Sequence, residues 1–149
     1  PANAGLSTRY LDAVQRHISR YGSLHGPYPF DKFAEVENFF PTGYGFPSFT
    51  LLGSRVLRLP FIPDTSLRHE VAHCWWGNGV FVDVTGGNWC EGLTTYVADY
   101  LSKEEHSGQE ARGYRLRTLE KYAFLAAGSQ DFPLSIFRSR FYPASQAVG

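Results

Sequence analysis

Apolar residues recur every three or four positions in several parts of the chain, which is the spacing of one face of an α-helix. A first helix is expected from Leu6 to Tyr21, with Gly22 ending it. A second is expected from roughly Trp89 to Leu101 and a third from about Gln109 to Ala127. Between these two, Lys103 to Gly108 is polar and is expected to be a loop.

Two shorter stretches have the composition of β-strands. In Lys32 to Phe40, Glu35 and Glu37 fall on the same face of the expected strand, and this face is expected to meet solvent. Pro41 to Pro47 is rich in turn residues. It leads into a short strand, Ser48 to Leu52, and the proline at its entrance favours the edge of a sheet. An edge strand can hold an extended peptide by backbone hydrogen bonds.

A further helix carries the sequence His-Glu-Val-Ala-His and is expected to end at Gly77 and Gly79. His69 and His73 lie one turn apart on it, about 40° around the axis, so both imidazoles can reach one metal ion. Glu70 projects to the side of this pair. Its carboxylate can therefore take a proton from a water molecule without being a metal ligand.

A third metal ligand is available in Glu91, in the first turn of the helix expected from Trp89. Two neutral imidazoles and one carboxylate are typical of an open, catalytic zinc site, whereas closed structural sites usually have four Cys or His ligands. The pattern predicts Zn²⁺ bound by His69, His73 and Glu91, with Glu70 as the general base.

Two cysteines, Cys74 and Cys90, each follow or precede a predicted ligand directly. Neighbouring residues on a helix point about 100° apart, so packing explains these thiols better than zinc binding does. A disulfide between them stays open at this point, because sequence does not supply the distance between the two residues.

Composition excludes several classes of partner. The 149 residues contain 14 basic and 14 acidic side chains, so no overall charge attracts nucleic acid, and we expect no nucleic-acid partner. No apolar run approaches the ~18 residues of a membrane-spanning helix.

The chain begins at Pro1 and has no methionine, so we expect a piece of a longer or processed protein. Its compartment stays open, and a periplasmic, extracellular or membrane-tethered parent is compatible with the sequence.

Three blocks of sequence resemble one family. His69 to Asn78 reads His-Glu-Val-Ala-His-Cys-Trp-Trp-Gly-Asn, Asn88 to Gly92 reads Asn-Trp-Cys-Glu-Gly, and Gly26 to Lys32 reads Gly-Pro-Tyr-Pro-Phe-Asp-Lys. These blocks are similar to those of the gluzincin peptidases of the alanyl aminopeptidase type. The resemblance covers roughly residues 6 to 105. It implies the same three zinc ligands and the same general base.

The resemblance implies an α+β fold, a thermolysin-like zincin catalytic domain that is truncated here and occupies residues 1–149. We expect a small, mostly N-terminal β-sheet whose edge strand packs on the zinc-bearing helices, and a helical C-terminal part. The implied function is zinc-dependent hydrolysis of peptide bonds in peptide or protein substrates, within a parent chain that has further domains. Two alternatives stay open, namely a non-catalytic zinc-containing domain that binds peptides and a zinc hydrolase of a non-peptide substrate.

The chain also departs from the family. One residue is missing from the connection between the last two zinc ligands, which a glycine-rich loop absorbs. Gly45 stands where the family's aminopeptidases carry the glutamate that binds the substrate's free amine, and Glu35 or Glu37 is an alternative anchor. The family's Tyr-x-Lys-Gly segment is missing, and Tyr142 is the nearest tyrosine. We therefore expect weak or no activity from these residues alone.

The substrate is less well defined than the metal site. Cleavage of N-terminal residues and internal cleavage both stay open. Three aromatic residues near the expected edge strand either line a pocket for an apolar substrate side chain or pack in the core: Tyr44, Phe46 and Phe49.

Overall fold

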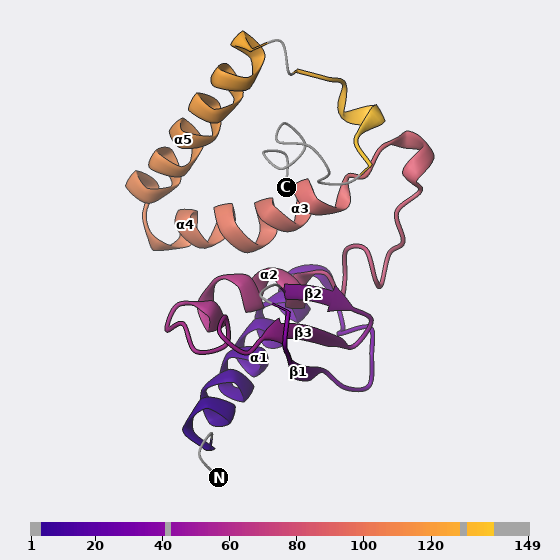
Figure 1. The fold of residues 1–149 in the computed structure, drawn as a ribbon, viewed down its shortest axis with the longest axis vertical. Coiled ribbons are helices and arrows are strands. Elements are labelled where there is room, and N and C mark those ends of the chain that lie inside the picture. The colour runs from indigo at the N-terminus through magenta and orange to yellow at the C-terminus, as the bar shows by residue number, and fades with distance from the viewer. Residues whose placement is uncertain (1–3, 41–42, 129–130, 139–149) are drawn as a thin grey trace. The chain divides into compact units, whose positions relative to one another are not determined.

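The computed structural model describes residues 4–40, 43–128 and 131–138, and the chain divides into two compact units, Pro1–Phe81 and Val82–Gly149 (Figure 1). The first unit combines a small sheet with two α-helices, and the regular elements described in the second are all helical. The structure therefore confirms a mixed α+β chain with a three-stranded, N-terminal sheet. The assignment of residues 1–149 to one partial catalytic domain stays a prediction.

The sheet consists of β1 (Ala34–Asn38), β2 (Gly43–Phe46) and β3 (Phe49–Gly53) in the order β1-β3-β2. β3 runs parallel to β1 and antiparallel to β2. The prediction of an edge strand at residues 48–52 is therefore wrong, since β3 is central and β2 lies at the border. The proline that suggested an edge precedes the strand and blocks none of its backbone pairing.

The hairpin between β2 and β3 explains this error. Phe46 faces Phe49 across the pair, so the connection is the two residues Pro47 and Ser48. Ser48 has a positive φ of 67°. A proline followed by a residue with positive φ is the arrangement of a type II turn. The turn-rich stretch expected from Pro41 to Pro47 is thus mostly strand β2, although residues 41–42 lie outside the described part.

Helix α1 (Ala4–His25) is longer than predicted and runs through Gly22. One glycine inside a helix costs only about 1 kcal/mol, which packing outweighs. The helix ends instead at Gly26, whose φ of +94° belongs to the left-handed region. Its buried face holds Tyr10, Ala13, Val14, His17 and Tyr21.

This buried face of α1 is anchored by polar contacts as well as by packing. The Tyr10 hydroxyl donates to the Leu57 carbonyl at 2.9 Å, and His17 Nε2 lies 2.7 Å from the Pro63 carbonyl. Pro63 belongs to the short 3-10 helix η1 (Ile62–Asp64), which leads into α2. Helix α1 therefore supports the segment that carries the two histidines.

Helix α2 (Ser66–Ala72) carries the histidine motif and is shorter than predicted, because it ends before Gly77 and Gly79 are reached. The chain then folds back on itself. The Val80 amide donates to the Trp75 carbonyl at 2.8 Å, and the Gly77 amide, at φ +106°, donates to the Val80 carbonyl at 2.9 Å. Gly77 and Gly79 therefore belong to this turn and do not end the helix.

In the second unit, α3 (Cys90–Thr95), the π-helix η3 (Tyr96–Tyr100) and α4 (Leu101–His106) follow one another without a break. The expected loop from Lys103 to Gly108 is therefore wrong. Its charged side chains suit a helix, since the Tyr100 hydroxyl donates to Glu104 at 2.8 Å and His106 lies 3.1 Å from Glu110. Only Ser107 is extended.

Helix α5 (Gly108–Ala127) confirms the third predicted helix. Ser107 caps it, because its hydroxyl accepts a hydrogen bond from the Glu110 amide at 3.1 Å. Two short 3-10 helices, η2 (Val84–Gly86) and η4 (Leu134–Ile136), flank the helical elements. Among the described helices, none combines the length and the apolar character that crossing a membrane requires. Tyr142 lies outside the described residues.

The turn after α2 generates a prediction about Gly79. A Cβ atom at Gly79 would lie 2.6 Å from the Cys74 carbonyl oxygen and 3.1 Å from that of Trp75. Backbone atoms cannot yield as a side chain does, so Gly79→Ala is expected to lower the free energy of unfolding by roughly 1–3 kcal/mol in urea titrations. Gly22→Ala is the matched control, since a Cβ there meets nothing within 4 Å and should stabilise α1 by about 0.5–1 kcal/mol. Equal effects of the two substitutions would contradict the tight turn.

Candidate functional site

Two histidines lie side by side on the first unit's helix α2. The His73 amide donates to the His69 carbonyl at 3.3 Å, so the helical spacing extends to His73 although the helix itself ends at Ala72. The two imidazole rings have their centroids 4.9 Å apart. Both residues are half-buried. The structure thus brings these two predicted ligands together.

The ring of His73 is oriented by the turn that follows α2. Its Nδ1 atom lies 3.0 Å from the Trp76 carbonyl oxygen. A carbonyl only accepts hydrogen bonds, so Nδ1 carries the proton and donates it, and in the neutral ring Nε2 keeps its lone pair. This is the arrangement that fixes a metal-binding histidine through its second nitrogen. No residue pattern signals this contact, because the partner is a backbone atom.

The border strand β2 passes directly beside the Glu70 carboxylate. A Cβ atom built on Gly43 would lie 3.4 Å from Glu70 Oε1, and one on Gly45 would lie 2.7 Å from Oε2 and 3.4 Å from His73 Cβ. Helix α2 and strand β2 are packed neighbours in the first unit (Figure 1). The absence of side chains at these two glycines is therefore what lets the strand approach the predicted general base.

The aromatic residues of this hairpin face away from Glu70. Side chains alternate along a strand, so the face opposite the two glycine positions carries Tyr44 and Phe46. Tyr44 is 53% exposed and Phe46 is 37% exposed, and the Phe46 ring stacks on that of Phe49 at 4.7 Å. Tyr44 and Phe46 therefore do not pack in the core, and the expectation that the three aromatic residues line a pocket for a substrate side chain stays a prediction.

Of the two candidate replacements for an amine-binding glutamate, Glu37 is ion-paired and Glu35 lines a separate cavity of the first unit. The Glu37 carboxylate accepts a hydrogen bond from Arg58 at 2.8 Å, which holds the pKa of Glu37 below its usual range. Glu35 lines a cavity against α1 and is half-buried, so the expectation that both carboxylates meet solvent is wrong for Glu35. At Gly45, a glutamate would begin with its Cβ against Glu70.

Glu91, the third predicted ligand, belongs to the second unit. It is half-buried and lies in the first turn of α3. The Asn88 side chain accepts a hydrogen bond from the Cys90 amide at 3.1 Å, which fixes the start of this helix. Asn88 precedes the N-cap residue Trp89, and asparagine side chains commonly accept a hydrogen bond from the amide two residues on, so the residue type is a signal for this contact. Glu91 is thus presented from a defined helix terminus.

Both cysteines carry thiols rather than a disulfide, and both are buried. The Tyr28 hydroxyl donates to Cys74 Sγ at 3.5 Å, and burial raises the pKa of the Cys74 thiol. Burial also raises the pKa of Cys90 to about 11. Since the thiolate is the form that binds metals, these surroundings agree with a packing role for both side chains.

Burial of the thiols predicts their reactivity. Alkylation with iodoacetamide should be slow at Cys74 and Cys90 in the folded chain and rapid at both in urea without a reductant, as counted by mass spectrometry. Rapid modification of the folded chain would contradict the burial. Modification in urea only after reduction would instead reveal a disulfide.

Comparison with known proteins gives a distant relationship. The chain is 27% identical over 150 residues to two curated proteins, aminopeptidase RNPEPL1 of Mus musculus and aminopeptidase RNPEPL1 of Homo sapiens. Each alignment covers 92% of this chain but 20% of the relative, so the chain spans about a fifth of their length. No family model matches the chain, and no solved structure matches it. The similarity indicates an aminopeptidase-like relationship.

Proposed function

We propose that this chain is the zinc-binding part of a thermolysin-like peptidase domain, in which His69, His73 and Glu91 hold the metal and Glu70 is the general base. The observation that carries the proposal is the pair of adjacent imidazoles, 4.9 Å apart, with the Glu70 carboxylate between them in sequence and beside strand β2. The distant similarity to an aminopeptidase supports peptide hydrolysis as the reaction.

The donor set suits zinc. Two imidazoles and one carboxylate are the ligand set of an open catalytic zinc site, and they leave a coordination position open. The contact between His73 Nδ1 and the Trp76 carbonyl leaves Nε2 as the donor atom of that ring. Zinc held in this way would lower the pKa of a water molecule toward ~7 and would polarise a substrate carbonyl group.

The chain's own residues supply the proton transfers and the substrate support. Glu70 accepts a proton from the attacking water and passes it to the amine that leaves. β2 pairs with β3 along one side and forms the border of the sheet on the other. An extended peptide that adds to this border by backbone hydrogen bonds would run past Glu70, because Gly43 and Gly45 bring the strand beside it.

The proposed base is tested by Glu70→Gln. Removal of a general base normally lowers turnover by about 10²–10⁴-fold while leaving metal ligands intact. We expect the variant to retain its zinc, measured by atomic emission on this chain, and to lose peptidase activity in a longer, active protein that contains it. Glu120→Gln, an exposed position on α5, is the control and should change neither value. Undiminished turnover in Glu70→Gln would overturn the mechanism.

The substrate class is tested with peptides that have free or acetylated N-termini. Gly45 offers no carboxylate for a free amine, so we expect both sets to be cleaved at similar rates. An enzyme that depends on a charged anchor would discriminate between them by orders of magnitude. Cleavage restricted to free N-termini, followed by mass spectrometry of the products, would show that another residue binds the amine.

A further inference from the structure

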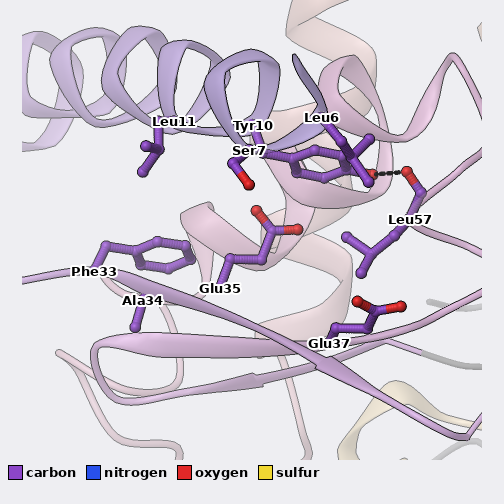
Figure 2. A pocket seen from close by; sticks show the side chains of 9 residues that line it. All are labelled: Leu6, Ser7, Tyr10, Leu11, Phe33, Ala34, Glu35, Glu37 and Leu57. Atoms are coloured by element: carbon purple, nitrogen blue, oxygen red, sulfur yellow. Dashed lines mark hydrogen bonds between the residues drawn. The ribbon is translucent and has the colours of Figure 1, made fainter. Parts of the chain in front are cut away.

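A second site lies in the first unit, in a cavity between helix α1 and strand β1. Its volume is about 240 Å³, below the ~300–1,000 Å³ of pockets for drug-sized ligands. Figure 2 shows the Glu35 carboxyl group pointing from the strand toward Ser7 and Tyr10 on the helix. Neither histidine of α2 nor Glu70 is among the described residues that line it. The cavity is therefore a separate place in the fold, of a size for a small ligand.

The walls of the cavity are mostly apolar, but they include one buried carboxylate oxygen. Leu6 and Leu11 of α1, Phe33 and Leu57 supply the apolar surface. Glu35 Oε1 is buried and has no hydrogen-bond partner within the described residues. An ionised carboxylate in such surroundings is costly unless a partner compensates its charge.

The charged and titratable groups around Glu35 do not supply this partner. No lysine, arginine or histidine is among the described lining residues. Glu37 also lines the cavity, and its carboxylate is paired with Arg58 at 2.8 Å. Arg9 donates to the Pro60 carbonyl. The Tyr10 hydroxyl is committed to the Leu57 carbonyl at 2.9 Å. Among the described residues, none therefore pairs a cation with the Glu35 carboxylate in this cavity.

We propose that this cavity binds a small organic ammonium ion, whose charged –NH₃⁺ group pairs with the Glu35 carboxylate and whose short apolar body contacts Leu6, Leu11 and Phe33. The ammonium group supplies the donor that Oε1 lacks, and a charge-assisted hydrogen bond of this kind is about twice as strong as a neutral one. A neutral ligand of the same shape would leave the carboxylate uncompensated. The binding needs no metal, so it is independent of the proposed peptidase function.

The ammonium ion competes with a proton for Glu35. Burial raises the pKa of Glu35 to about 7. The carboxyl group is then mostly ionised at pH 8, and only about one molecule in a hundred is ionised at pH 5. An alkylamine stays charged at both pH values. Its affinity is therefore expected to fall by about a hundredfold from pH 8 to pH 5.

The test is calorimetric titration with n-butylamine and with the neutral isostere n-butanol. We expect the amine to bind at pH 8 and the alcohol not to bind comparably. Glu35→Gln should abolish amine binding, whereas Asp12→Asn, which removes one exposed negative charge from α1, should not change it. Equal binding of amine and alcohol, amine binding that survives Glu35→Gln, or no amine binding at all would each overturn the proposal.

Folding of the Glu35→Gln variant has its own expected result. Because burial raises the pKa of Glu35 from 4.5 to about 7, ionisation of this carboxyl group destabilises the folded chain. The stability that the protonated group contributes is fully present below pH 4.5 and is lost as the pH rises through 7. The Glu35→Gln variant should not lose stability over this pH range, and at pH 8 it should be more stable than the unaltered chain.

A pH series of amine binding to the unaltered chain gives a test that needs no variant. An affinity that is equal at pH 5 and pH 8 would contradict the role of Glu35.

Discussion

The approach of strand β2 to Glu70 is the constraint on which the arrangement of the first unit depends. The strand can run this close only because residues 43 and 45 have no side chains, and a Cβ at Gly45 would already lie 2.7 Å from the carboxylate. Gly43 is also closely packed within the sheet, since a Cβ there would lie 3.1 Å from the buried Leu52 side chain of β3. The close approach of the strand to Glu70 and the packing of the sheet therefore depend on the same two glycines.

This constraint also bears on the substrate. A glutamate at position 45 would compete with Glu70 for the same space, because its Cβ would already lie 2.7 Å from the Glu70 carboxylate. The strand's aromatic side chains point to the opposite face, so in the proposed peptidase backbone groups would be the main recognition surface beside Glu70. A surface of this kind favours extended peptides without selecting a particular side chain. It thus fits a peptidase relationship without the specificity of an amine-anchored enzyme.

Much of the structure was predictable from local pattern, and the errors have physical causes. The one-turn spacing of His69 and His73 and the periodicity of α5 are properties of a single helix, so the sequence contains them. The pairing of β3 between two strands depends on residues distant in sequence, and Gly-Tyr-Gly-Phe has a turn-like composition although it forms strand β2. Helix length was also not predictable from the local pattern. Gly22 and the charged run at 103–106 would end a helix only if packing and side-chain contacts did not stabilise it.

The candidate site shows the same division. Residue types and spacing named the two imidazoles and the carboxylates, but the contacts that orient them lie in the backbone, such as the Trp76 carbonyl on His73. The burial of Glu35 could not be read from its alternating strand, because both faces of a strand in a small sheet can be covered. Helix α1 covers this one, and no local pattern in residues 32–40 records that.

The account is tested most directly by X-ray absorption at the zinc edge, recorded on the zinc-loaded chain. The predicted ligand set of two imidazoles and one carboxylate gives only nitrogen and oxygen neighbours, at ~2.0–2.2 Å from the metal. A sulfur neighbour at ~2.3 Å would place Cys74 or Cys90 in the coordination shell and contradict the assignment of the site.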